Sequence, residues 1–198
     1  MSVRIDGVVL LDKPAGLPIC LGEATKYSQD LLEADKTYVA QVKFGQRTDT
    51  GDAEGLVIEE LPLPVFAEDV ALKLALDSLL PAFTGPVSQI PPMYSALKRD
   101  GKPLYEYARA GVELERAPRN ITIHTIRWIN VQWPEATLEV SCSKGTYIRV
   151  LAEDLGKALG CGAHLVGLRR TEVGHLTLEQ SFTIESIQKG LQDSSSYI

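Results

Sequence analysis

The chain has 198 residues, of which 44% are hydrophobic, and this is enough to bury the core of one domain. No apolar run approaches the length of a membrane span, and no charged-then-apolar signal pattern opens the chain. The formal net charge of −6, taken over the whole chain, argues against a protein that binds nucleic acid.

The charge is unevenly distributed, which weakens that exclusion. Residues 17–80 hold twelve acidic and five basic side chains, whereas residues 93–128 hold seven basic and four acidic ones. Residues 141–174 hold five basic and three acidic side chains. Because RNA affinity depends on local basic surface, the two later segments are candidates for an RNA-binding surface.

The N-terminal part predicts a strand and a helix. Residues 7–16 begin as a continuous apolar run that ends at Pro14 and Gly16, which predicts a buried strand followed by a turn. Residues 24–34 can form a helix with two leucines, Leu31 and Leu32, facing inward.

Residues 36–45 predict a strand, because one face carries Tyr38, Ala40, Val42 and Phe44 in alternation. Residues 46–55 predict a polar turn that leads to a second strand at 56–60. The acids of this turn, Asp49, Asp52 and Glu54, do not have the spacing of a calcium loop. A metal-dependent hydrolase that uses these three acids is one alternative function, and loss of activity on adding a chelator would support it.

Residues 68–80 have the apolar spacing of an amphipathic helix. The side chains available to the core are Val70, Leu72, Leu76, Leu79 and Leu80.

The segment from Pro81 to Asn120 has many prolines and glycines and interleaves aromatic with basic side chains over residues 94–109. This interleaving suits RNA, whose phosphates need cations and whose unstacked bases need flat partners. The expected phosphate contacts are Lys98, Arg99, Lys102 and Arg109.

Residues 121–128 and 137–142 predict two strands joined in a hairpin across residues 133–135. A turn follows, and then a helix in which Ile148, Leu151, Leu155 and Leu159 share one face and Gly160 is the C-cap. Tyr147 and Arg149 then lie in the first turn. Arg149 is unfavourable there by about 0.3–1 kcal/mol, so we expect a compensating carboxylate or phosphate, although an ordinary ion pair is an equal alternative.

Residues 164–174 predict a strand, and a short helix is expected from Phe182. Cys161 and His164 could ligate zinc, but nothing supplies the other two ligands, so no metal site is expected. Three cysteines without paired spacing favour a reducing compartment, the cytoplasm. Alternating strands with few helices and no regular repeat indicate an α+β fold.

Three sequence blocks carry a family resemblance: Ser143–Arg149, Cys161–His164 and Leu168–Arg170. They resemble the bacterial tRNA pseudouridine synthases of the TruB type. This resemblance implies the pseudouridine-synthase fold, a mixed and largely antiparallel sheet with flanking helices. It implies one catalytic domain over residues 1–198, with an RNA-gripping thumb insertion at about 82–120.

The resemblance also implies an activity, the isomerisation of the T-loop uridine (uridine-55) of tRNA to pseudouridine by base flipping and an aspartate nucleophile. Arg149 would hold that aspartate ionised, with Tyr147 in the same cluster. Tyr38 and Leu168 would sandwich the base, and Tyr38 would accept a proton late in the reaction. Lys13 is expected beside the cleft. The partner would be the T-stem-loop, bound by a monomer without metal or organic cofactor.

The chain departs from the family pattern between Gly16 and Leu17. The family has a helix and a loop of the form Gly-His-Thr-Gly-x-Leu-Asp-Pro there, which contains the nucleophile. The small C-terminal RNA-binding domain of many members has no counterpart either. A non-catalytic tRNA-binding or tRNA-folding module is therefore the alternative function.

Two explanations of the missing block are open. A true loss would leave Arg149 without its carboxylate, at a cost of about 3–5 kcal/mol, yet Tyr147 and Arg149 are both retained. We therefore predict that the molecule contains the block as a mobile segment between Gly16 and Leu17. A separation of the Gly16 and Leu17 Cα atoms well beyond about 3.8 Å would show it.

Overall fold

A computed structural model describes residues 7–11 and 17–195, and the chain divides into two compact units. The first unit comprises Met1–Val39 and Leu168–Ile198, and the second comprises Ala40–Gly167. Two strands, β3 (Lys36–Phe44) and β11 (Ala163–Val173), continue from one unit into the other.

The second unit is built on a sheet in which the strands follow in the order β11, β3, β10 (Glu135–Cys142), β9 (Arg119–Gln132) and β6 (Gly85–Gln89). β9 pairs antiparallel with both β10 and β6. The predicted hairpin across residues 133–135 and the expected α+β class are therefore confirmed, and the hairpin strands are longer than predicted.

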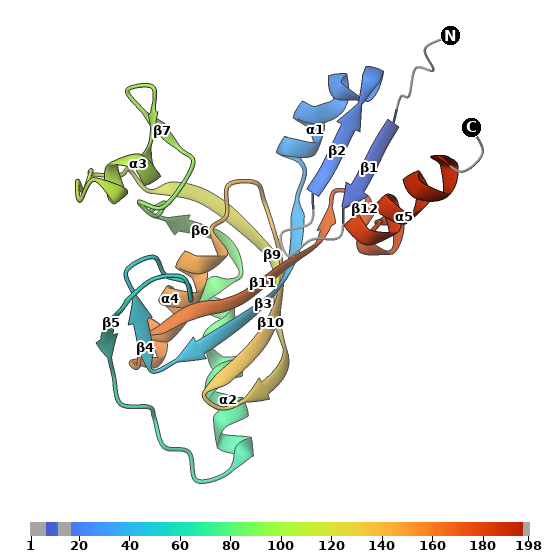
Figure 1. The fold of residues 1–198 in the computed structure, drawn as a ribbon. Helices are drawn as coiled ribbons and strands as arrows, with labels where there is room; N and C mark the ends of the chain where they lie inside the picture. Colours follow the sequence, from blue (N-terminus) through green and yellow to red (C-terminus); the bar gives the residue numbers. More distant parts are fainter. Residues whose placement is uncertain (1–6, 12–16, 196–198) are drawn as a thin grey trace. The chain divides into compact units, whose positions relative to one another are not determined.

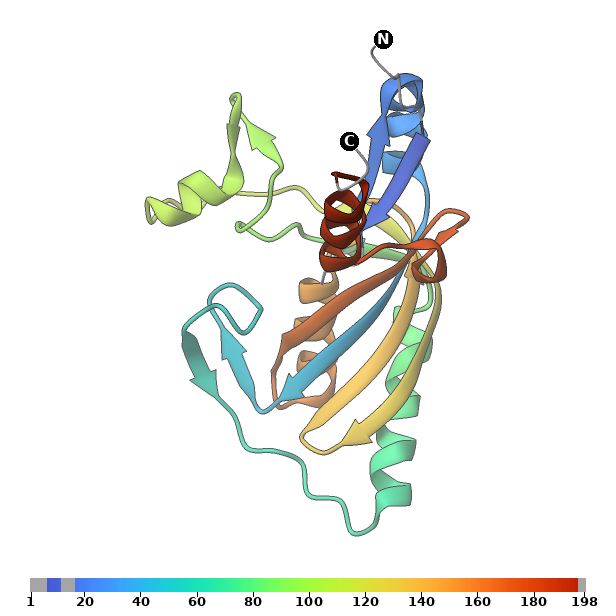
Figure 2. The same ribbon diagram turned by 45° about the vertical axis from the view of Figure 1, so that its right-hand side comes forward.

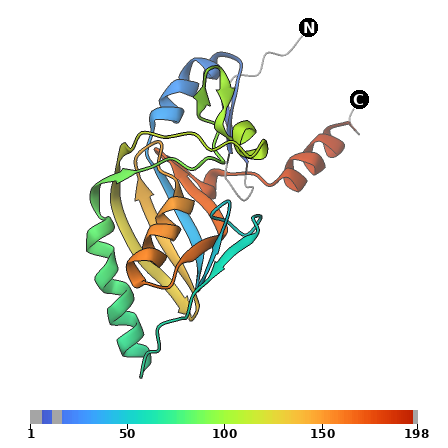
Figure 3. The same ribbon diagram turned by 90° about the vertical axis from the view of Figure 1, so that its left-hand side faces the viewer.

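Two helices, α2 (Asp69–Leu79) and α4 (Ile148–Leu159), lie side by side on one face of this sheet (Figures 2 and 3). They cover a core whose largest members are each less than 2% exposed and include Phe44, Leu76, Ile123, Leu138, Leu151 and Leu155. Alternation along β10 and spacings of three and four along α4 place these apolar side chains at the contact between sheet and helices.

The helix α4 lies very close to the sheet because one of its residues has no side chain. A Cβ atom added to Gly156 would lie 2.2 Å from the backbone nitrogen of Ala163, at the start of β11. The helix ends as predicted at Gly160, whose φ of 82° is in the left-handed region that glycine adopts without strain.

The segment between β6 and β9 projects from the sheet (Figure 1). It contains β7 (Lys98–Arg99), β8 (Lys102–Pro103) and α3 (Leu104–Arg109), and Leu104 is only 5% exposed. Residues 85–89 pair with β9 inside the sheet, so the projecting part is 90–118, which is narrower than the expected insertion of 82–120. We call residues 90–118 the thumb segment.

A two-stranded ribbon completes the second unit. β4 (Gln46–Thr48) pairs antiparallel with β5 (Val57–Glu60). The second predicted strand is therefore confirmed, but residues 46–48, which were predicted to lie in the turn, form its partner strand. The loop between them, residues 49–56, reaches the first turns of α4.

The first unit contains a hairpin of β1 (Gly7–Leu11) and β2 (Leu17–Leu21), the 3₁₀ helix η1 (Gly22–Tyr27) and α1 (Ser28–Glu33). Its other elements are the start of β3, the end of β11, β12 (Leu176–Thr177), η3 (Leu178–Gln180) and α5 (Ile184–Ser195). Lys13 and Gly16 lie outside the described residues, so the separation of the Gly16 and Leu17 Cα atoms stays a prediction.

Three expectations about burial were wrong. Leu32 is 65% exposed, because α1 has only six residues and does not bury both of its leucines. Val70 is 64% exposed, because it lies on the opposite face of α2 from the buried Leu72 and Leu76. Val8 is 39% exposed, because β1 belongs to a two-stranded sheet that cannot enclose both faces of its strands.

The contact at Gly156 generates a stability prediction. We expect Gly156→Ala to lower the free energy of unfolding by at least about 2 kcal/mol, because the new methyl group meets backbone that cannot move aside, although alanine favours the helix by about 1 kcal/mol. The neighbouring Lys157→Ala, on an exposed side chain, should change it by less than about 0.5 kcal/mol. Urea denaturation of both variants measures this, and equal midpoints would contradict the close packing.

Candidate functional site

Arg149 is held by three acceptors from two loops. Its Nη1 donates to the Asp52 carboxylate (2.9 Å) and to the carbonyl oxygen of Thr50 (3.2 Å). Its Nη2 donates to the carbonyl oxygen of Tyr94 (2.5 Å). The side chains of Arg149 and Asp52 are only 23% and 24% exposed, so this ion pair is partly shielded from water.

Asp52 is itself fixed by the loop that carries it. Its Oδ1 accepts from the Thr50 hydroxyl (2.6 Å) and from the backbone N–H of Glu54 (3.2 Å). The loop is tied to β11, because Ala53 N–H donates to the Leu165 carbonyl and Leu165 N–H donates to the Gly51 carbonyl. The carboxylate is therefore held in place on its own loop and not only by Arg149.

Glycine lets this loop approach α4. Gly51 has a φ of 75°, and a Cβ there would lie 3.2 Å from the carboxyl carbon of Glu153, one helical turn after Arg149. Burial raises the pKa of Glu153 above its ordinary value of 4.5. The guanidinium groups of Arg47 and Arg149 lower this pKa, and neighbouring carboxylates raise it.

The expected compensation of Arg149 is found inside the protein. We predicted either a compensating carboxylate or phosphate, or an ordinary ion pair. Asp52 is a carboxylate that forms an ion pair with Arg149, so it fits both expectations. The expectation that Arg149 would lack a carboxylate without the family's catalytic loop is wrong. Sequence reasoning treated Asp52 as a turn residue, and the signal that could have found it is the pair of glycines, Gly51 and Gly55, around a polar loop.

Tyr147 precedes the helix and does not lie in its first turn as predicted. It is the N-cap of α4 and has extended backbone angles, and its side chain forms no capping hydrogen bond. Its peptide groups instead contact the side chain of Gln89.

Tyr38 and Leu168 belong to the first unit. The guanidinium of Arg170 lies 5.4 Å from the centre of the Tyr38 ring, and its Nε donates to the Tyr38 hydroxyl (3.3 Å). Leu168 is half-buried and lies two residues before Arg170 on β11. Tyr147 and Arg149 belong to the second unit, so the convergence of all four residues in one cleft stays a prediction.

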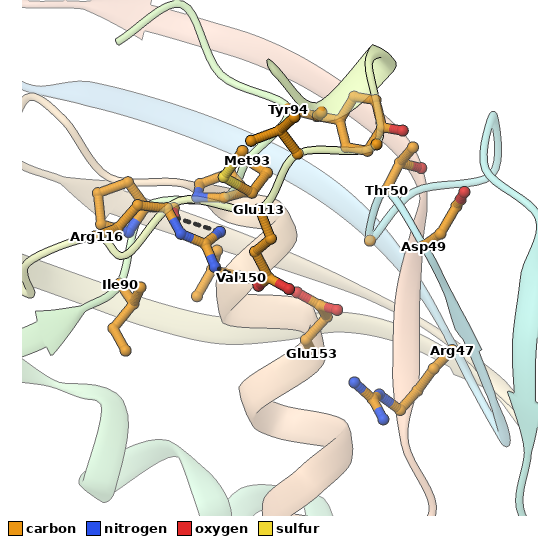
Figure 4. A pocket seen from close by; sticks show the side chains of 16 residues that line it. Arg47, Asp49, Thr50, Ile90, Met93, Tyr94, Glu113, Arg116, Val150 and Glu153 are labelled. Carbon is orange, nitrogen blue, oxygen red and sulfur yellow. Dashed lines mark hydrogen bonds and ion pairs between the residues drawn. The ribbon is translucent and has the colours of Figure 1, made fainter. Parts of the chain in front are cut away.

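A cavity of about 510 Å³ lies beside the Arg149 cluster (Figure 4). Thr50 and Tyr94, whose carbonyls accept from Arg149, line it together with Glu153 and part of the thumb segment. On the thumb side, Arg116 pairs with Glu113 at 3.1 Å, as Figure 4 shows. The cavity thus connects the thumb segment with the first two turns of α4.

The predicted phosphate contacts lie on the thumb segment in two different settings. Lys98 and Arg99 are exposed on β7. Lys102 lies 4.9 Å from the centre of the Tyr107 ring, and Arg109 lies 5.2 Å from that of Tyr105, in cation–π geometry. Their role in RNA binding stays a prediction, and Lys13 lies outside the described residues.

The alternative function of a metal-dependent hydrolase gains no support. Within residues 7–11 and 17–195 no group of three His, Cys, Asp or Glu side chains is placed to hold a metal ion. The Asp49 and Asp52 carboxylates instead accept hydrogen bonds from their own loop. In the same residues no helix is long and apolar enough to cross a membrane.

Two family models together match residues 11–196 and place the chain in the pseudouridine-synthase class. Residues 11–148 match the family model described as TruB family pseudouridylate synthase (N terminal domain). Residues 149–196 match the model described as tRNA pseudouridylate synthase B C-terminal domain. The chain therefore belongs to the TruB family of pseudouridylate synthases.

Bacterial relatives named tRNA pseudouridine synthase B are similar over most of the chain. The protein of Cupriavidus metallidurans is 52% identical, with 92% of this chain and 67% of the relative covered. That of Burkholderia lata is 51% identical, with 92% and 65% covered. The chain thus spans about two thirds of the length of these relatives.

Solved structures share the fold at low identity. One titled as an H/ACA RNP bound to a substrate RNA containing 2'-deoxyuridine has a TM-score of 0.65 at 21% identity, covering 97% of this chain and 56% of the other. A Cbf5-Nop10-Gar1 complex has a TM-score of 0.57 at 24% identity, covering 91% and 45%.

The relatives contain internal residues that this chain lacks. The similarity to the Cupriavidus protein extends over 217 residues, whereas 92% of 198 residues is only about 182. About 35 positions of that relative therefore have no counterpart inside the matched region. This length suits the helix and loop expected between Gly16 and Leu17.

The Asp52–Arg149 pair generates a second prediction. We expect Asp52→Ala to lower the free energy of unfolding by about 1–3 kcal/mol, because Arg149 loses its charged partner in a partly buried position. Glu54→Ala, which removes an exposed acid from the same loop, is the matched control. A double-mutant cycle with Arg149→Met isolates the pair, and a coupling energy near zero would contradict its role.

A third prediction follows from the raised pKa of Glu153. A carboxyl group whose pKa is raised on folding adds stability below its unfolded pKa, ordinarily 4.5, and this contribution is lost as the pH rises through the folded pKa. Glu153→Gln should therefore be more stable than the parent at neutral pH and lose less stability between pH 4.5 and 7. Unfolding midpoints of the parent, Glu153→Gln and the control Glu54→Gln, measured across this pH range, test the prediction. If the midpoints of the parent and Glu153→Gln changed in parallel with pH, the prediction would be wrong.

Proposed function

We propose that this protein isomerises a uridine of tRNA to pseudouridine, with the T-loop uridine-55 as its target. The observation that carries the proposal is the fixed Arg149 at the N-terminal end of α4, within a chain that matches the TruB family from residue 11 to residue 196. The relatives' name, tRNA pseudouridine synthase B, supports the substrate.

The reaction must break the N-glycosidic bond, turn the uracil and rejoin it through carbon. The target base has to leave its stack at a cost of a few kcal/mol. The aspartate of the block expected between Gly16 and Leu17 then attacks, and Arg149 keeps that carboxylate ionised and aimed. Tyr38 and Leu168 hold the flipped base, and the T-stem-loop is bound by a monomer in the cytoplasm without a cofactor.

The nucleophile defines the second candidate function. Asp52 pairs with Arg149, and about 35 internal positions of the Cupriavidus relative have no counterpart here, so the charge of Arg149 is balanced without the expected aspartate. This favours a module that binds or refolds tRNA without chemistry. Binding is common to both candidates, and only conversion separates them.

The deciding experiment measures pseudouridine in tRNA transcripts after incubation with the purified chain. Conversion of the T-loop uridine, absent in a transcript with cytidine at that position and lost in Arg149→Lys, supports the first candidate. Tight binding without conversion supports the second. A chimera that carries the Cupriavidus segment between Gly16 and Leu17 adds a test, because gained activity would show that the remaining site is competent.

A fourth prediction concerns the exposed cations of β7. We expect Lys98→Gln/Arg99→Gln to weaken tRNA binding and to reduce the slope of log K against log salt by about 2, since each phosphate contact releases about one counterion. Lys73→Gln/Lys157→Gln, on α2 and α4, makes the same charge change and should leave the slope unaltered. An unchanged slope in the β7 variant would show that the thumb segment does not bind the phosphates.

A further inference from the structure

The side chain of Gln89 forms two hydrogen bonds with the backbone of Tyr147. Gln89 is the last residue of β6 and is only 2% exposed. Its Oε1 accepts from the Tyr147 N–H (3.0 Å), and its Nε2 donates to the Tyr147 carbonyl oxygen (3.2 Å). One buried amide thus satisfies both peptide groups of a residue 58 positions away.

This contact acts at the start of α4. The first N–H groups of a helix have no partner within it, and a side chain usually caps them. Tyr147, the N-cap, makes no such bond with its own side chain. Its carbonyl also accepts from Leu151 in the first helical turn (3.1 Å), so Gln89 holds the group from which α4 begins.

The chain that follows Gln89 reaches the same helix end again. Tyr94, five residues later, accepts from Nη2 of Arg149 (2.5 Å). Between them, the Pro91 carbonyl accepts from Nη1 of Arg116 (3.2 Å) in the thumb segment. Residues 90–94 therefore form a short connector that follows Gln89, which is bound to the backbone of Tyr147, and ends at Tyr94, which is bound to the side chain of Arg149.

Gln89 and Tyr94 thus bind residues that are only two positions apart, the N-cap Tyr147 and Arg149 in the first turn of α4. The backbone contact sets where the helix starts, and the carbonyl of Tyr94 sets where the guanidinium points. If Gln89 released Tyr147, the connector would move relative to α4, and the Tyr94 acceptor would move with it. A glutamine that merely filled a buried space would have no such effect on Arg149.

We propose that Gln89 is a positioning residue that sets the geometry of Tyr147 and, through the connector, of Arg149. The inference rests on the proposed role of Tyr147 and Arg149 in uridine isomerisation. Its geometric part can be measured without activity, so a failure of the proposed function is distinguishable from a failure of this inference.

The first test compares Gln89→Met, which keeps the size but removes both hydrogen bonds, with Ser88→Ala on the exposed neighbour. Hydrogen exchange reports the Tyr147 amide, and NMR of ¹⁵N-arginine protein reports rotation of the Arg149 guanidinium, assigned by its loss in Arg149→Lys. We expect Gln89→Met to speed both by about tenfold or more, from the loss of two buried hydrogen bonds. Ser88→Ala should change neither.

Gln89→Glu provides a rescue measurement. A carboxylate still accepts from the Tyr147 N–H, but it cannot donate to the Tyr147 carbonyl until it is protonated. Rotation of Arg149 should therefore be fast at neutral pH and slow again as the pH falls. The protection factor of the Tyr147 amide, which corrects for the intrinsic pH dependence of exchange, should rise over the same range. Parent protein and Ser88→Ala should lack this pH profile.

The outcomes are separable. A faster Tyr147 amide with unchanged Arg149 rotation would overturn the inference and leave Gln89 a local structural residue. Unchanged exchange at Tyr147 would overturn it as well. If the parent converts uridine, kcat of Gln89→Met should fall about tenfold with the tRNA Kd unchanged, and an unaltered kcat would also overturn it. If the parent converts none, the proposed function fails, and the two NMR and exchange readouts still decide the inference.

Discussion

The second unit depends on the direct contact between the backbone of α4 and the start of β11 at Gly156. No side chain separates the two elements there, so direct backbone contact sets the distance between the helix and the sheet. The loop that carries Asp52 pairs with Leu165 on that same strand, two residues after Ala163. Helix, strand and loop are thereby fixed together, and the Asp52–Arg149 distance follows from this packing rather than from the ion pair alone.

The position of Arg149 is energetically unfavourable for a cation in two ways. A cation in the first turn of a helix is opposed by the helix dipole, and a partly buried cation also loses hydration. One carboxylate and two carbonyl oxygens offset both costs, because all three accept hydrogen bonds from the guanidinium. The result is a cation whose position is set before any RNA arrives, which is what electrostatic preorganisation of a site requires.

Local periodicity predicted much of this architecture. The hairpin of β9 and β10 and the end of α4 at Gly160 follow from alternation, helical spacing and glycine conformation. The partner of Arg149 did not follow, because Asp52 lies 97 positions away and its approach depends on the positive φ of Gly51. The face of α2 was also ambiguous, since apolar residues occur on both of its sides and only packing selects Leu72 and Leu76. Tyr147 was placed one residue too far into the helix, as boundaries set by caps often are.

The ion pair between Arg149 and Asp52 also affects how such a protein can evolve. Where a buried charge has its only partner in a catalytic segment, deletion of that segment unbalances the fold, and the product is removed by cellular quality control. Here the counter-charge comes from a loop that is anchored to the sheet independently. Loss of the nucleophile in one genetic event would leave a folded descendant, on which selection could act through RNA contact alone.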